Sequence, residues 1–114
     1  LQEGKVSDFW QPEDVFEMAT LGGAQAMGLA DQIGSLEVGK KADLVLFDFK
    51  KIHLTPATDP LGNLVHVGQG RDVDTVIVDG CIVVEHGKAT SVDQEQIRND
   101  AAVAAESLWK RATQ

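Results

Sequence analysis

The chain has 114 residues, of which 43% are hydrophobic and 25% are charged, and its formal net charge is −8, which indicates one small, acidic globular domain. Ten basic residues among eighteen acidic ones argue against a nucleic-acid partner, because binding to phosphates needs a basic face. No run of apolar residues approaches the about 18 that cross a membrane, and no signal peptide is visible. The single cysteine cannot form an internal disulfide. A cytoplasmic protein without a membrane partner is therefore expected.

The first predicted element is a helical pair within residues 12–28. Pro12 suits the first turn of a helix, where its missing N–H costs nothing, and the two acidic residues after it complement the helix dipole. The consecutive glycines Gly22 and Gly23 each disfavour a helix by about 1 kcal/mol relative to Ala. Gly28 suits a C-cap. We therefore predict two short helices with a bend between them.

Residues 33–48 read as a glycine-punctuated turn followed by a strand at Asp43–Asp48. Two glycines five residues apart, followed by lysine, superficially fit a phosphate-binding loop. However, Lys41 stands where the loop needs Ser or Thr, and a strand follows where the phosphate needs a helix N-terminus. We interpret this run as a turn into a strand.

The middle of the chain predicts a hairpin preceded by a short helix. Proline-rich loop chemistry fills residues 50–61, and Asp59-Pro60 can begin a helix that ends at Val67. Asp79-Gly80 is the strongest hairpin signal, because a type I′ turn needs positive φ at both central positions. The strands expected around it are Val73–Asp79 and Cys81–Glu85, with a second turn at His86-Gly87 leading into Lys88–Thr90.

The last predicted element is the clearest helix. Ser91 with Gln94 three residues later fits a capping box, while Asp93 is a competing cap. Apolar residues then recur at helical spacing and form one stripe with Trp109 beside it. The members of this stripe are Ile97, Ala101, Ala104, Ala105, Leu108 and Ala112.

Few residues are candidates for a metal site or a catalytic nucleophile. His53, His66 and His86 are 13 and 20 residues apart, and none has a His or Cys partner at the spacings that place two ligands on one metal. Cys81 is expected to be a small, half-buried hydrophobic residue. The polar segment 72–75 is expected to be a solvated approach to its strand.

The order of these pieces resembles the C-terminal region of the metal-dependent amidohydrolase superfamily. Glu17–Leu29 is similar to the helices that close its barrel, and Ile33–Asp48 is similar to the approach to its small β domain. The resemblance is strongest to the branch of S-adenosylhomocysteine/5′-methylthioadenosine deaminases and triazine chlorohydrolases. The later matching pieces are His53-Leu-Thr-Pro56, Asp59-Pro60, Leu64-Val65-His66, Asp72–Gly80 and Val83-Val84-Glu85.

This resemblance implies a parent enzyme with a (β/α)8 barrel and one Zn²⁺ or Fe²⁺ ion at the C-terminal ends of its strands. The ion, held by a His-x-His pair, further histidines and an aspartate, activates a water that attacks a ring carbon bearing an amino group or a halide. The sequence contains no His-x-His pair. No catalytic, cofactor-binding or metal residue is therefore assigned to this chain, and no metal is expected to bind to it alone.

The resemblance further implies an α+β fold: the C-terminal part of a composite β-sandwich with flanking helices, including the last helices of a (β/α)8 barrel whose remainder is absent. Residues 1–30 would be barrel helices, 31–90 sandwich strands and 91–114 a C-terminal helix. The expected partner is the missing N-terminal part of the enzyme. Without it, unpaired strand edges predict a homo-oligomer and no catalysis. The alternative is a free-standing β-rich binding module.

Overall fold

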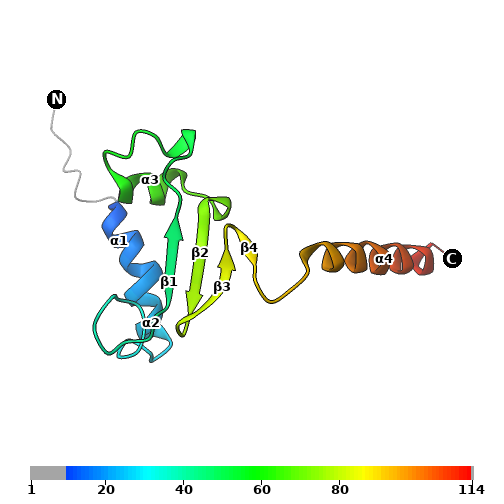
Figure 1. The fold of residues 1–114 in the computed structure, drawn as a ribbon, viewed down its shortest axis with the longest axis horizontal. Helices are drawn as coiled ribbons and strands as arrows, with labels where there is room; N and C mark the ends of the chain where they lie inside the picture. The colour runs from blue at the N-terminus through cyan, green and yellow to red at the C-terminus, as the bar shows by residue number, and fades with distance from the viewer. Residues whose placement is uncertain (1–9, 114) are drawn as a thin grey trace.

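The computed structural model describes residues 10–113 as an α+β fold with one four-stranded antiparallel sheet and flanking helices (Figure 1). The strand order is β1-β2-β3-β4, so each strand pairs with the next strand along the chain. The first nine residues of the predicted segment 1–30 and the last residue of the segment 91–114 lie outside the described residues. The strands are β1 (Leu44–Phe47), β2 (Val73–Val78), β3 (Cys81–Glu85) and β4 (Lys88–Ala89).

The N-terminal helical stretch runs without a break through the glycine pair. Helix α1 (Pro12–Glu17) continues as a π-helical segment, η2 (Met18–Gly22), and then as α2 (Gly23–Ala26). The predicted start at Pro12 is confirmed, but the predicted bend is wrong, because Gly22 and Gly23 both keep right-handed helical angles. A Cβ at Gly22 would lie 3.3 Å from the carbonyl oxygen of Glu17, so glycine fits the wider π turn closely.

The turn before β1 packs back against the helical stretch. Gly34 has φ +91°, and a Cβ there would lie 2.7 Å from the Cβ of Ala24, which is 2% exposed. Only glycine allows both this backbone conformation and this close approach. Strand β1 follows the turn, so the prediction of a turn into a strand is confirmed.

The central hairpin forms at the predicted turn, and its register shifts between Val76 and Ile77. β2 and β3 are antiparallel, and Val78 lies opposite Cys81 across the turn. Asp79 and Gly80 have φ of 50° and 80°, as a type I′ turn requires. Asp43, just before β1, accepts a hydrogen bond of 2.7 Å from the backbone N–H of Asp79, which ties the turn to the neighbouring strand. The second predicted turn, at His86-Gly87, also forms.

A small packed region lies where the 3₁₀ helix η3 (Ile52–Leu54) meets α3 (Pro60–Val67). Leu54 is 1% exposed, and among the described residues only Ala24 and Leu54 are buried hydrophobic side chains. Asn63 on α3 donates hydrogen bonds of 2.9 Å to the backbone oxygens of Leu54 and Pro56. Asp59 caps α3 by accepting from the N–H of Gly62, which confirms the predicted start of this helix.

Helix α4 (Gln94–Ala112) projects away from the rest of the molecule (Figure 1). Asp93 caps it by accepting from the N–H groups of Glu95 and Gln96, which decides between the two predicted caps. Every residue of α4 is exposed. The radius of gyration is 19.8 Å, against about 13 Å for a compact domain of this length. No helix among residues 10–113 is long and apolar enough to cross a membrane.

Candidate functional site

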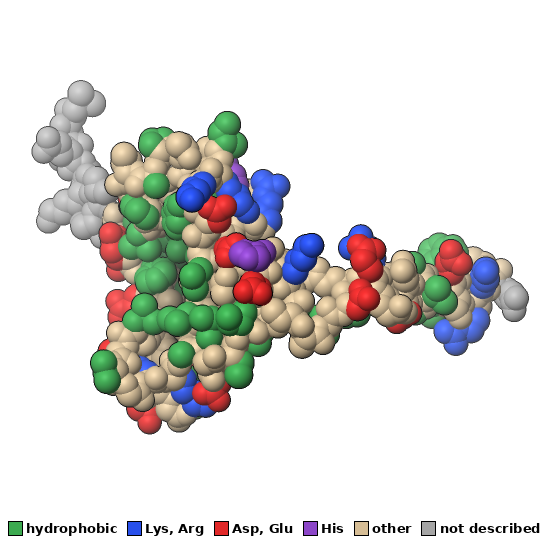
Figure 2. Space-filling model, in the orientation of Figure 1, with side chains coloured by type: hydrophobic (Ala, Val, Ile, Leu, Met, Phe, Trp, Pro, Cys, Tyr) green, Lys and Arg blue, Asp and Glu red, His purple; other side chains and the backbone are tan. Residues whose placement is uncertain are grey.

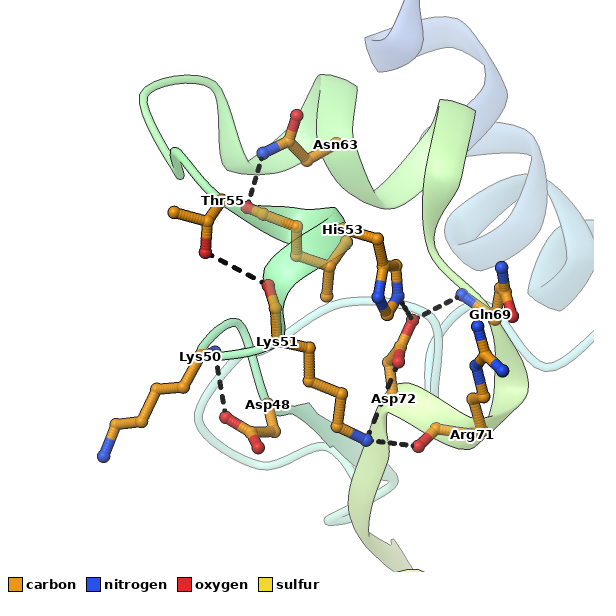
Figure 3. A network of polar contacts seen from close by, with 10 residues as sticks. Asp48, Lys50, Lys51, His53, Thr55, Asn63, Gln69, Arg71 and Asp72 are labelled. Atoms are coloured by element: carbon orange, nitrogen blue, oxygen red, sulfur yellow. Dashed lines mark hydrogen bonds and ion pairs between the residues drawn. The ribbon is translucent and has the colours of Figure 1, made fainter.

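The most constrained polar site surrounds Asp72, the last residue of the 3₁₀ helix η4 (Gly70–Asp72) and the immediate neighbour of β2 (Figure 3). Its side chain has no solvent exposure. One carboxylate oxygen, Oδ2, accepts a hydrogen bond of 2.9 Å from the backbone N–H of Gln69 and lies 2.8 Å from Nε2 of His53. The carboxylate therefore joins η3 to the start of β2.

The other oxygen of this carboxylate faces a lysine. Nζ of Lys51 lies 3.7 Å from Oδ1 of Asp72 and donates a hydrogen bond of 2.6 Å to the backbone oxygen of Arg71. Oδ1 itself accepts no hydrogen bond. The hydrogen bond with His53 is the main reason that the pKa of Asp72 lies below its usual value. Burial by itself would raise this pKa.

The prediction of a solvated segment at residues 72–75 is wrong at its first residue. Asp72 is buried because η4 turns its side chain back under the η3 loop, and the backbone N–H of Asp48 also donates to its carbonyl oxygen, at 2.8 Å. Asp74 is partly exposed. The hydrogen bond from the Thr75 hydroxyl lowers the pKa of Asp74 most, and the hydrogen bond with His86 lowers it further. A local signal for the buried site existed, since an aspartate three residues after Gln69 fits a capping box.

The three histidines do not converge. His53 is half-buried against Asp72, the exposed His86 lies 3.3 Å from Asp74, and His66 is exposed in the last turn of α3. Among residues 10–113, no group of three or more His, Cys, Asp or Glu residues could hold a metal ion. The donors present are two separate His–Asp pairs, one of which already has a lysine beside it. This set does not fit a zinc or iron site.

The two lysines of the glycine-punctuated turn have structural partners, and Lys41 lies 3.5 Å from Asp79 in the hairpin turn. Nζ of Lys40 donates hydrogen bonds of 2.6 Å to the backbone oxygen of Ala30 and to the Ser35 hydroxyl, and it lies 3.3 Å from Glu37. The hydrogen bond from the Ser35 hydroxyl lowers the pKa of Glu37 most, and the hydrogen bond from Lys40 lowers it further. These contacts and the strand that follows agree with a structural turn.

Cys81 is exposed, so the prediction of a half-buried residue is wrong. It begins β3 directly after the hairpin turn, within a run of exposed residues from Val78 to Ile82. Its place at the hairpin turn therefore left the thiol exposed.

Comparison with known proteins identifies the family. The model of the amidohydrolase family matches residues 3–83. The 5-methylthioadenosine/S-adenosylhomocysteine deaminase of Moorella thermoacetica is 52% identical over 80 residues, which are 70% of this chain and 19% of that protein. The chain thus spans about a fifth of the length of this curated relative.

Solved structures agree over a longer stretch. A zinc-bound adenosine deaminase from Xanthomonas campestris superposes with a TM-score of 0.75 at 31% identity. The zinc complex of the atrazine chlorohydrolase from Arthrobacter aurescens TC1 shares the fold, with a TM-score of 0.79 at 24% identity. Each match covers 90% of this chain and 22% of the other. The resemblance seen in the motif order is confirmed, and the chain belongs to the amidohydrolase family.

Proposed function

We propose that this chain is the C-terminal part of a metal-dependent hydrolase that removes an amino group or a halide from a heteroaromatic ring. The observation that carries this proposal is the family match over residues 3–83 of a chain that spans about a fifth of its relative's length. The relatives are named as deaminases of adenine nucleosides and as a chlorohydrolase of a triazine, and two of the solved structures contain zinc.

The role of the chain within that enzyme is structural. The charged side chains with the most contacts, those of Asp72 and Lys40, hold loops in place and are thereby occupied. The metal ligands and the reacting groups would belong to the rest of the enzyme, because the residues described do not fit a metal site. A free-standing binding module has no support in the comparisons.

The exposed apolar surface supports a composite sandwich and barrel. β1 is an edge strand of the sheet, and its Val45 and Leu46 are each about half exposed. Figure 2 shows hydrophobic side chains gathered over the body of the molecule. An edge with unpaired N–H and C=O groups beside apolar side chains accepts a further strand. N-terminal strands of the enzyme would pair there, and barrel helices would cover α1 and η2, where Phe16 and Met18 are exposed.

Reconstitution tests the proposal. The chain is mixed with the N-terminal part of the Moorella thermoacetica deaminase, truncated where its match to this chain begins. Adenosine, 5′-methylthioadenosine and S-adenosylhomocysteine are then assayed with Zn²⁺ or Fe²⁺, and a chlorotriazine is tested in parallel. We expect turnover by the pair and none by either part. Metal-dependent turnover by the 114-residue chain alone would contradict the structural role, and an inactive but stable pair would contradict the proposed reaction.

A further inference from the structure

Helix α4 carries an apolar stripe that nothing in the described chain covers. At about 100° per residue, the members of the stripe fall within an arc of about 140°. Leu108 is 60% exposed and Trp109 is 72% exposed. The only charged side chain inside the arc is that of Arg98, which is paired with Glu95 at 3.0 Å. The stripe is formed by Ile97, Ala101, Ala104, Ala105, Leu108, Trp109 and Ala112.

The opposite face of α4 is polar, with one exception that is useful as a control. Charged and amide side chains occupy it, but Val103 also lies there and is 69% exposed. A helix with one apolar and one polar face gains stability only when the apolar face is buried. The stripe therefore requires a surface outside the described chain.

Part of α4 is also matched in much longer proteins. Residues 1–93 are about 82% of the chain, so a superposition that covers 90% of it must include part of α4. The adenosine deaminase and the chlorohydrolase both superpose to this extent, and this chain covers 22% of each. The family match, by contrast, ends at residue 83. At least part of the helix is thus shared with these structures beyond the stretch that the family model matches, and they contain ample further chain to cover it.

The width of the stripe indicates what kind of surface covers it. Two helices that pair between copies of a chain use a narrow seam of two positions in seven. An arc of about 140° instead suits a helix lying on a globular body. The alanines allow close approach, while Leu108 and Trp109 supply the large side chains that fill gaps in such a surface.

We propose that the apolar stripe of α4 docks on the apolar outer surface of the barrel of the same enzyme, as an anchor separate from the sheet. This inference rests on the proposed function, which supplies the barrel. At about 1.5 Å per residue, the 19 residues of α4 extend over about 28 Å, enough to lie along several barrel helices.

The test uses the reconstituted pair described above and two matched variants. Leu108→Lys places a charge in the stripe, and Val103→Lys places the same charge on the polar face. Both positions are exposed in the chain, and lysine favours helices, so far-UV circular dichroism of the two variants should agree. We expect L108K to weaken the binding of the N-terminal part at least tenfold by biolayer interferometry and V103K to change it less than twofold.

The outcomes separate the two proposals. Equal affinities for both variants, or no binding by the unmodified chain, would overturn the docking of α4. Turnover by a pair whose affinity L108K does not change would refute the docking and leave the proposed reaction standing. If the pair were inactive but L108K weakened its binding, the proposed reaction would be refuted and the docking of α4 would stand. If L108K instead abolished self-association in analytical ultracentrifugation without weakening the pair, a second copy would be the occupant and the proposal would be wrong.

Discussion

Asp72 brings a carboxylate into a fully buried position, and such a charge is tolerated only when hydrogen bonds and counter-charges replace water. His53 and the backbone of Gln69 supply the hydrogen bonds, and Lys51 supplies the nearby positive charge. His53 lies on η3 and Lys51 directly before it, and Asp72 follows His53 by 19 residues. The side chain thus joins two segments that lack a large hydrophobic core between them.

We expect Asp72→Asn to loosen this junction. The amide keeps the shape of the side chain but loses the charge, so the attraction to Lys51 disappears and the acceptor for Gln69 is weakened. Amide hydrogen exchange should show at least tenfold faster exchange of the Gln69 N–H. Asp74→Asn, at a partly exposed site, is the matched control and should change that rate less than twofold. Equal effects of the two substitutions would contradict the prediction that the buried carboxylate of Asp72 holds this junction together.

The lowered pKa of Asp72 makes this junction sensitive to acid. A carboxyl group with a lower pKa in the folded than in the unfolded state stabilises the fold fully above the unfolded value, about 3.9. That contribution is lost as the pH falls through the folded value. Carboxyl chemical shifts in an NMR titration should therefore place the inflection of Asp72 below about 3.9. An inflection above this value would contradict the assignment.

At the scale of elements, the conformation of the turn residues determines the hairpin, and the sequence predicts it. Asp79 and Gly80 take positive φ, and a Cβ at Gly80 would meet nothing within 4 Å. The requirement for glycine is therefore a matter of backbone conformation rather than of space. The glycine pair in the N-terminal helix, in contrast, keeps helical angles although its composition predicts a bend. There, low helix propensity was outweighed by the close fit of Gly22 in a π turn.

We expect Gly80→Ala to lower the free energy of unfolding by about 1–2 kcal/mol, because an L-residue is strained in the left-handed region. Gly70→Ala adds the same methyl group at a position that also has free space but no positive φ, and it should cause no loss. Urea unfolding followed by far-UV circular dichroism measures both. If the two alanine variants were equally stable, the turn would not depend on its backbone conformation.

At the scale of the whole molecule, the chain leaves too much surface exposed for a protein of its size. Its accessible area is 9303 Å², against about 6,100 Å² for a folded monomer of 12.3 kDa. The difference, about 3,200 Å² on this chain alone, is well above the about 800 Å² per partner of a standard interface between protein chains. The exposed surface includes the edge strand β1 and the apolar stripe of α4.

We therefore expect the isolated chain to form homo-oligomers when its N-terminal partner is missing. Light scattering after size-exclusion chromatography at high micromolar concentration should give a mass well above 12.3 kDa. Val45→Lys places a charge on the edge strand and should reduce the association. Val103→Lys on the polar face of α4 serves as the control. A clean monomer for the unmodified chain would contradict the prediction.

The sequence by itself determined the local structure and the family of this protein. Pro12, Asp59 and Asp93 mark helix starts, and Asp79-Gly80 marks the hairpin, because capping and turn conformation depend on a few neighbouring residues. Only the tertiary structure decided which side chains are buried, since burial depends on segments that are distant in the chain. For this reason the enclosure of Asp72, the exposure of Cys81 and the isolation of α4 emerged only once the elements were placed together.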